Sequence, residues 1–254
     1  MPAKPIISLI IPCYNEETNI QKGVLDKIGN YTKANPEFGE VIIVDDGSTD
    51  ATKTIIRSRY LPQYPKFSLR ENRHQGKAFA VISGIKTAHH PYVMFSDIDL
   101  ATPIEEAEKL IAQIANHSQI IIGSRNYRRE NAPVLRKVMA VGFIFVRNLL
   151  IGLKGIKDTQ CGFKLLEKTA ALKVIDRLRV FRPRSTISGS SVSAGFDLEF
   201  LFLAAKFGYK ITEVPVIWRH VETKNVNFLK DSIETITDIL KIKFYDLRGS
   251  YSLS

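Results

Sequence analysis

The chain has 254 residues, of which 44% are hydrophobic and 24% charged, and its formal net charge is +10. A chain of this length can bury a sizeable core as one large α/β domain or two small ones, which excludes a fold that depends on disulfide staples. Two cysteines, Cys13 and Cys161, give no disulfide framework, so we expect a reducing compartment. The N-terminal residues do not show the pattern of a secretory signal peptide.

The positive charge is concentrated in one segment. Residues 121–184 contain fifteen Lys/Arg and four Asp/Glu, a net charge of +11, so the rest of the chain nets −1. Such an excess predicts an anionic partner. Nucleic acid, an anionic membrane surface and a phosphorylated substrate all satisfy it at this point, and so does an ordinary solvated surface.

Short apolar runs alternate with helical patterns through the first half of the chain. We expect strands at 6–11, 41–44, 66–70, 93–96 and 119–122, with helices between them, including one at 18–34. Ser48 or Thr49 is a suitable cap for the helix after the second strand. Strands that alternate with helices predict an α/β fold with a mostly parallel sheet.

Polar residues follow the ends of these strands. They are Tyr14, Asn15 and Glu16 after the first, Asp45 and Asp46 after the second, Asp97 and Asp99 after the fourth, and Arg125 after the last. Because the carboxyl ends of parallel strands meet at one sheet edge, these side chains are expected to converge on one ligand.

The stretch from Val93 to Leu100 is central to this interpretation. A buried strand runs into Asp97 and Asp99, and a Thr102–Glu105 capping box with Pro103 at the first helical position predicts an immediate helix. Two carboxylates in such a turn can face one divalent cation that is also held by phosphates. Turn chemistry alone is the simpler alternative.

Glycine-rich phosphate loops are missing from the sequence. No G-x-G-x-x-G follows the first strand, and Gly76-Lys77 lacks the upstream glycine and the hydroxyl residue of a P-loop. A metal ion with carboxylates is therefore the remaining way to hold a diphosphate here.

Six motifs, in order and spacing, resemble glycosyltransferase family 2 and its polyprenyl-phosphate branch. They are I-I-P-C-Y-N-E (10–16), V-D-D-G-S-T-D (44–50), S-D-I-D (96–99), D-T-Q-C-G-F-K (158–164), F-D-L-E (196–199) and E-V-P-V-I-W (213–218). The resemblance covers about residues 6–244. It implies the GT-A, nucleotide-diphospho-sugar transferase fold over 1–254, with a donor-binding half (1–125) and an acceptor-binding half (126–254).

The resemblance also implies roles for individual residues. Asp97 and Asp99 would hold Mg²⁺ or Mn²⁺, and Asp158, Asp99 and Arg125 would form the catalytic set. The implied donor-binding residues are Pro12, Tyr14, Asn15, Glu16, Val44, Asp45, Asp46, Gly76, Lys77, Asp97, Ile98, Asp99 and Gln160. Asp158 matches an aspartate sometimes interpreted as a base. A phosphate acceptor is already largely a dianion at neutral pH, so we expect no strong base to be needed.

Acceptor phosphate is expected at Arg136, Arg219, His220 and Lys224. The sequence departs from the family here: T-K-N (223–225) stands where relatives often have G-S-K, so the lysine comes one place early. A structural histidine is an equally good explanation of His220.

Two amphipathic segments are candidates for contact with a membrane surface. Residues 138–153 are strongly apolar but too short to span a bilayer, and Arg129, Arg136, Arg147 and Lys154 would form one polar line on a helix. Residues 228–244 predict a second amphipathic helix, with apolar residues in a stripe along one face. We expect a peripheral protein on the cytoplasmic leaflet, although packing of these faces into the core is the alternative.

The resemblance thus implies a metal-dependent, inverting glycosyltransferase that moves glucose from UDP-glucose to a polyprenyl (dolichyl or undecaprenyl) phosphate. Transfer of mannose from GDP-mannose or of N-acetylglucosamine from UDP-N-acetylglucosamine is the alternative within the family. A sugar-nucleotide nucleotidyltransferase and a non-enzymatic binder of anionic lipid or nucleic acid are rivals from other classes. We expect no nucleic-acid partner, and the oligomeric state is open.

Overall fold

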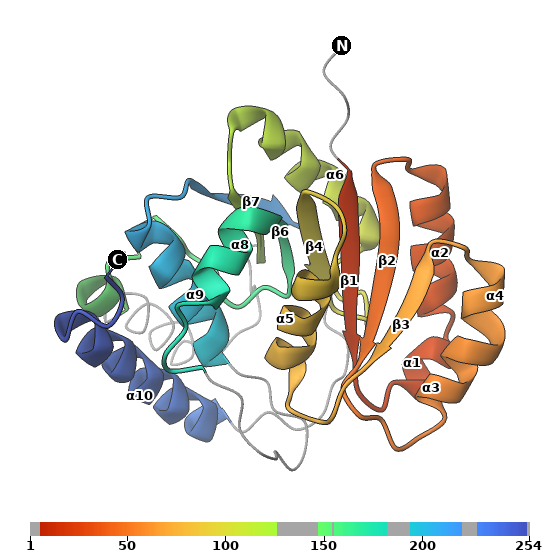
Figure 1. Ribbon diagram of the computed structural model, residues 1–254, viewed down its shortest axis with the longest axis horizontal. Coiled ribbons are helices and arrows are strands. Elements are labelled where there is room, and N and C mark those ends of the chain that lie inside the picture. Colours follow the sequence, from red (N-terminus) through yellow and green to blue (C-terminus); the bar gives the residue numbers. More distant parts are fainter. Residues whose placement is uncertain (1–5, 126–146, 154, 182–193, 220–227, 253–254) are drawn as a thin grey trace.

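The computed structural model describes residues 6–125, 147–153, 155–181, 194–219 and 228–252 (Figure 1). Of the predicted site residues, Arg136, His220 and Lys224 lie outside these ranges. So do most of the apolar segment 138–153 and the Arg129 and Lys154 positions of its expected polar line.

A seven-stranded mixed sheet forms the centre of the molecule, in the order β3-β2-β1-β4-β6-β5-β7 (Figure 1). Its strands are β1 (Ile7–Cys13), β2 (Phe38–Asp45), β3 (Phe67–Glu71), β4 (Tyr92–Ser96), β5 (Ile120–Arg125), β6 (Phe163–Glu167) and β7 (Ile211–Val216). All described pairings are parallel except the two made by β6. The predicted mostly parallel α/β sheet is confirmed.

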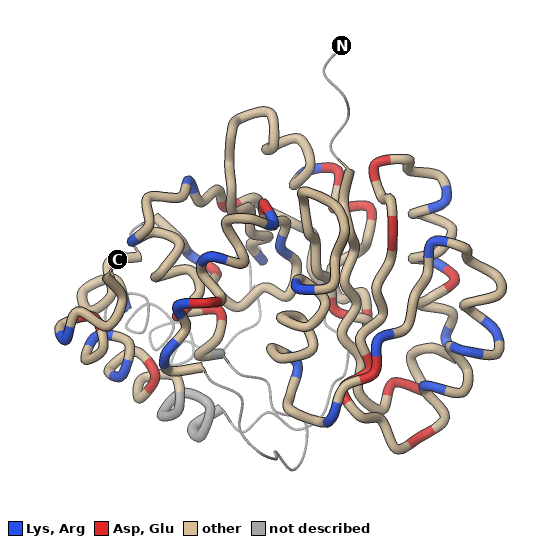
Figure 2. Tube along the Cα trace, in the orientation of Figure 1, with Lys and Arg blue, Asp and Glu red and all other residues tan. Residues whose placement is uncertain are grey.

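Helices cover both faces of the sheet. In chain order they are α1 (Glu17–Gln21), α2 (Val24–Ala34), α3 (Thr52–Ile55), η1 (Ile56–Tyr60), α4 (Leu61–Gln63), α5 (Lys77–Thr87), η2 (Ile104–Glu106), α6 (Ala107–Ile111), η3 (Ala112–Asn116), α8 (Lys168–Ile175), α9 (Ala194–Lys206) and α10 (Phe228–Leu247). Helices α5, α8 and α9 lie over the face turned to the viewer in Figure 1. Figure 2 shows acidic and basic positions distributed over both halves of the described chain.

Burial on both faces explains why β1 is so apolar. All seven of its residues are buried. Ile10 belongs to the core cluster under α5, α8 and α9, whereas Leu9 and Ile11 belong to the cluster under α2 and α6. A strand covered on both sides needs a nearly continuous apolar run rather than an alternating one.

Strand β6 places a distant part of the chain beside the first half of the sheet. It is antiparallel to β4 and β5, with Ser96 paired to Phe163 and Ile122 paired to Lys164. Its amino end therefore lies at the edge where the parallel strands have their carboxyl ends. The preceding segment, residues 158–162, consequently reaches the same edge as the D-x-D turn.

Three local predictions about helices were wrong. The helix expected at 18–34 is broken at Gly23, whose φ of 79° is left-handed. The capping box after the D-x-D turn does not form: Pro103 is itself the N-cap of a 3₁₀ turn, its ψ of 141° is extended, and no side chain caps it. Ser48 does not cap the next helix, because its Oγ accepts a hydrogen bond from the Asn15 N–H instead.

Arg147 does not belong to an exposed polar line. Its side chain is 1% exposed, and its guanidinium donates hydrogen bonds to the Ile156 carbonyl and the Asn148 side chain. Residues 147–151 are helical, and Ile156, whose carbonyl accepts from the guanidinium, follows them in the chain. Across the described part of the chain, no helix has the length and apolar character needed to cross a bilayer.

Candidate active site

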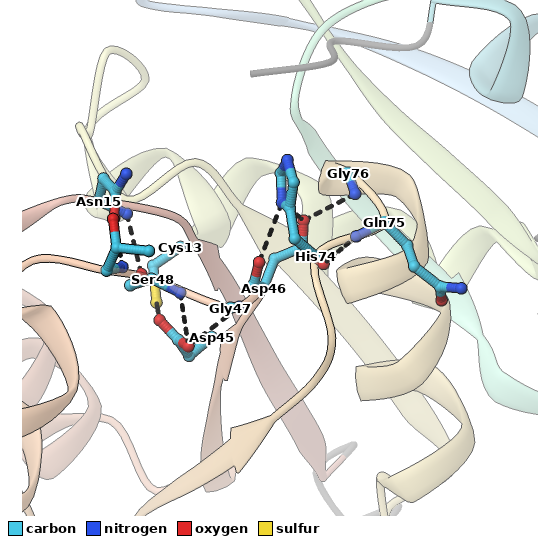
Figure 3. A network of polar contacts seen from close by, with 10 residues as sticks. Cys13, Asn15, Asp45, Asp46, Gly47, Ser48, His74, Gln75 and Gly76 are labelled. Carbon is cyan, nitrogen blue, oxygen red and sulfur yellow. Dashed lines mark hydrogen bonds and ion pairs between the residues drawn. The ribbon is translucent and has the colours of Figure 1, made fainter. Parts of the chain in front are cut away.

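Asp45 organises the turn after β2. It is fully buried, and its Oδ2 accepts hydrogen bonds from the N–H groups of Gly47 at 3.1 Å and Ser48 at 3.0 Å. Gly47 has a φ of 81°, and a Cβ there would lie 2.9 Å from the His74 backbone nitrogen. The Asp45 carboxylate therefore stabilises the turn and is occupied by backbone donors (Figure 3).

The loop after β1 packs on this turn. Asn15 adopts a left-handed φ of 53°, which lets its Oδ1 accept the Thr49 N–H at 2.8 Å. Glu16 receives the Asn19 side-chain amide on its Oε2 at 2.6 Å. Pro12 and Val44 are paired across β1 and β2, and both are buried, so their side chains belong to the core.

Asp46 is the second carboxylate of this pair, and it connects the β2 turn to the loop before α5. Its oxygens accept the N–H groups of Gln75 at 3.0 Å and Gly76 at 2.7 Å, and Nδ1 of His74 lies 2.8 Å from Oδ2. The His74 ring stacks on Tyr14, with centroids 4.0 Å apart and planes inclined by 15°. Sequence reasoning missed His74, since a lone histidine in a loop gives no signal of its own.

The D-x-D turn differs from the Asp45–Asp46 turn in the partners of its two carboxylates. Asp97 forms an ion pair with Lys77, and Asp99 accepts the Ala101 N–H on Oδ1 at 3.0 Å. A Cβ on Gly162 would collide with the Asp97 carboxylate, so a larger residue there would require that side chain to move. Ile98, expected among the donor-binding residues, is buried in the core with 4% exposure.

The pKa values of Asp99 and of the neighbouring Lys77 are both raised. Burial, and secondarily the neighbouring Asp97 carboxylate, raises the pKa of Asp99. Burial opposes the charge on Lys77, but the nearby carboxylates, Asp97 foremost, raise its pKa. Two mutually repelling carboxylates supply the oxygen ligands that a hard divalent cation prefers. Within the described ranges no cluster of three or more His, Cys, Asp or Glu side chains is placed to hold a metal.

Arg125 and Asp158 form a two-pronged ion pair at the same edge. The Arg125 Nε and Nη2 donate to the two Asp158 carboxylate oxygens at 2.7 and 2.9 Å, and the Arg125 N–H adds a third bond at 3.0 Å. Burial opposes ionisation of Asp158, but the hydrogen bonds and charge of Arg125 lower its pKa overall. A carboxylate held in this way is a weak base.

A small cavity of about 50 Å³ brings several predicted residues together. It is lined by Ser96, Asp97, Ala101, Thr102, Arg125, Gln160, Cys161, Gly162 and Trp218. The Arg125 guanidinium lies 5.9 Å from the centre of the Trp218 ring, and Gln160 is anchored through its N–H to Asp158. Asp97, Arg125 and Gln160, which lie up to 63 positions apart in the numbering, therefore line one cavity.

Lys164 is a buried charge that sequence reasoning did not single out as a site residue. Its side chain is 1% exposed, and Nζ donates to the Cys161 carbonyl at 2.6 Å and to Asp197 at 2.7 Å. Lys164 therefore ties the 158–162 segment to the first turn of α9. Glu199, two residues further on, is fully buried and accepts three backbone N–H groups and the Tyr251 hydroxyl, so it has a structural role.

Arg219 lies just beyond β7 and is exposed. Its N–H donates to the Ala101 carbonyl at 2.7 Å, which fixes the end of β7 against the D-x-D turn. The other expected phosphate-binding residues, Arg136, His220 and Lys224, are outside the described ranges, so Arg219 is the member of this set that the structure describes.

Solved structures with the same architecture include glucosyl-3-phosphoglycerate synthase from Mycobacterium tuberculosis in complex with Mn²⁺, uridine diphosphate and glucosyl-3-phosphoglycerate. That chain is 19% identical, with a TM-score of 0.66 over 94% of this chain and 80% of the other. Mannosyl-3-phosphoglycerate synthase from Rubrobacter xylanophilus has a TM-score of 0.69 at 13% identity, over 96% and 75%. At these identities the likeness shows the fold, which is the expected GT-A fold.

Sequence relatives extend along nearly the whole chain. A dolichyl-phosphate beta-glucosyltransferase of Trichomonas vaginalis is 32% identical over 99% of this chain and 77% of its own length. The Homo sapiens protein of that name is 30% identical over 97% and 78%. The family profile described as Glycosyl transferase family 2 matches residues 8–174, more than half of the sequence. The chain therefore belongs to glycosyl transferase family 2.

Proposed function

We propose that the protein transfers glucose from UDP-glucose to a dolichyl or related polyprenyl phosphate, with inversion at the anomeric carbon. The observation that supports this most is the meeting of Asp97, Arg125 and Gln160 around one cavity, in a chain about a third identical to dolichyl-phosphate beta-glucosyltransferases. The donor occupies the edge formed by residues 1–125, and the acceptor enters from the 126–254 side.

The D-x-D turn supplies the cation site in this proposal. Asp97 and Asp99 would hold Mg²⁺ or Mn²⁺, and the diphosphate and water would complete the coordination shell. When bound, the cation neutralises charge on the departing nucleoside diphosphate. Lys77, which contacts Asp97, adds a protein cation beside the same diphosphate. The pKa of Asp99 is raised by burial first and by the Asp97 carboxylate second, and a bound divalent cation would offset both effects.

Arg125 lines the same cavity as Asp97, and the ion pair with Asp158 makes the two residues act as a unit. Asp158 orients the guanidinium, and Arg125 presents positive charge to the phosphates. The lowered pKa of Asp158 argues against a proton-abstracting role. A phosphate dianion needs no such base, because its own oxygen can attack the anomeric carbon, and positioning then supplies most of the rate.

We also propose peripheral attachment to the cytoplasmic face of a membrane. Helix α10 exposes large apolar side chains spaced by four, four and three residues: Ile236 (43%), Leu240 (54%), Phe244 (49%) and Leu247 (76%). This spacing places them along one face of a helix. Lys241 and Lys243 lie between them in the sequence and Arg248 follows Leu247, and these cations suit anionic headgroups. Co-sedimentation with anionic vesicles at low salt tests this. A protein that stays in the supernatant would contradict it.

A donor screen tests the reaction itself. Purified protein is incubated with a short polyprenyl phosphate, Mn²⁺ or Mg²⁺, and UDP-glucose, UDP-N-acetylglucosamine or GDP-mannose, and lipid-linked sugar is measured. We expect product with UDP-glucose and its loss in EDTA. Product with only one of the other donors would overturn the sugar assignment and keep the reaction class. Silence from folded, nucleotide-binding protein with all three donors would overturn the acceptor.

A further inference from the structure

One histidine contacts both the end of β2 and the loop after β1, at the edge of the sheet where we propose that the donor nucleotide binds. His74, from the loop between β3 and α5, lies between Asp46 at the end of β2 and Tyr14 after β1. We infer that His74 is a positioning residue that holds the Tyr14 ring as a stacking platform for the nucleobase of the donor. This inference rests on the proposed nucleotide-sugar donor.

The Asp46 side of this contact is rigid. Asp46 is 2% exposed, and its carboxylate accepts the N–H groups of Gln75 and Gly76 as well as facing His74. Figure 3 shows Asp46 with His74, Gln75 and Gly76 around it. The carboxylate thus holds three consecutive residues of one loop, so His74 has little freedom to shift along the chain.

The hydrogen bonds of His74 define which ring nitrogen carries a proton. Nδ1 lies 2.8 Å from the Asp46 carboxylate and 3.0 Å from the Asp46 carbonyl oxygen. Both neighbours are acceptors, so Nδ1 must be protonated and donate. This arrangement orients the imidazole plane as well as its position.

The plane of the imidazole then sets the plane of Tyr14. With centroids 4.0 Å apart and an angle of 15°, the two rings are in parallel stacking contact. The His74 side chain is 17% exposed, and Tyr14 is only partly buried. A tyrosine on a surface loop would otherwise sample several rotamers. Gly47 supports the same geometry, since a Cβ there would lie 2.9 Å from the His74 backbone nitrogen and push the loop before α5 away from the turn after β2.

A pre-oriented aromatic ring is a general means of binding a nucleobase, because stacking costs less when the ring is already in place. The contacts described above join His74 to Asp46 and Tyr14, which follow β2 and β1. Asp97 and Asp99, the proposed metal ligands, follow β4. Loss of His74 should therefore weaken binding of the base and leave binding of the diphosphate nearly unchanged.

The test is a set of binding titrations with Mn²⁺ present, using UDP, GDP and inorganic pyrophosphate on wild type, His74→Ala, His74→Gln and His89→Ala. The control His89 also contacts a carboxylate, Glu40, but it is 81% exposed and away from this loop. We expect His74→Ala to weaken UDP binding about tenfold or more and pyrophosphate binding less than twofold. His74→Gln, which can still donate to Asp46 but cannot stack, should resemble His74→Ala.

Other results decide against the inference. Unchanged UDP affinity in His74→Ala, or equal losses for UDP and pyrophosphate, would overturn it, as would the same loss in His89→Ala. If His74→Ala does not fold, the same readings are taken from His74→Gln. Wild type that binds GDP rather than UDP would overturn the donor assignment, and the comparison is then made on GDP. Normal UDP binding without sugar transfer would overturn the proposed function alone.

Discussion

Two pairs of aspartates follow parallel strands at the same edge of the sheet, yet their surroundings differ. Asp45 and Asp46 are buried, and their carboxylates are occupied by N–H donors from the chain itself. Asp97 and Asp99 keep charge in a turn with one lysine and one backbone donor, and the pKa of Asp99 is raised by burial and by its neighbour. The first pair therefore builds the loops, whereas the second is suited to an external cation.

The largest expected effect is on catalysis. Asp99→Ala should lower kcat for glucosyl transfer on the order of 10³-fold, because it removes an oxygen ligand of the proposed cation. Folding stability should change little, because removal of a repelling carboxylate offsets the loss of the acceptor for the Ala101 N–H. Transfer assays and thermal melts measure the two effects. A variant that is clearly less stable but keeps its specific activity would break the distinction between the pairs.

Lys164→Met tests whether a third carboxylate, Asp197, depends on a buried partner. The change leaves the Asp197 charge uncompensated beside an apolar site, so the free energy of unfolding should fall by about 3 kcal/mol. Urea denaturation measures it. The double variant Lys164→Met/Asp197→Leu should recover part of the loss, and a double variant that is no better than the single one would show that the pair is not coupled.

Asp45→Ala should act mainly on stability. It leaves the buried N–H groups of Gly47 and Ser48 without their acceptor, at a cost of about 2 kcal/mol in the free energy of unfolding. Asp45→Asn retains one acceptor oxygen and should lose less. Glu71→Ala removes an exposed ion pair with Arg57 and serves as the control, with a change below about 0.5 kcal/mol. If Asp45→Ala and Glu71→Ala behave alike, the Asp45 turn is not stabilising.

The smallest expected effect is a pH dependence at Asp158. Because its pKa is lowered in the folded protein, ionised Asp158 stabilises the fold at pH values above the unfolded pKa of about 3.9. That contribution is lost as the pH falls through the folded pKa. Relative to Asp158→Asn, wild type should be more stable by about 1 kcal/mol between pH 5 and 8, with the difference shrinking below about pH 4. A difference that grows on acidification would contradict the sign.

The sequence was sufficient for the parallel strands of the first half, because strands covered on both faces leave continuous apolar runs such as that of β1. It also predicted that polar residues from different strand ends meet, as Asp97 and Arg125 do around one cavity. The capping box of Thr102 and Glu105 failed because the backbone is still extended at Pro103, which is itself the N-cap of a 3₁₀ turn that begins at Ile104. His74 and Lys164 were missed for another reason. Their partners, Tyr14, Asp46 and Asp197, are far away in the chain, and only the folded structure brings them together.

The position of β6 has a consequence for biosynthesis. Strands β4 and β5 are separated by β6, so the edge of β4 stays unpaired until residues 163–167 have left the ribosome. Only then do Asp158, Gln160 and Gly162 reach the D-x-D turn. A fragment that ends near residue 125 would expose an open apolar strand edge and be prone to aggregation. Residues 1–125 therefore depend on the later strand β6 to complete their sheet.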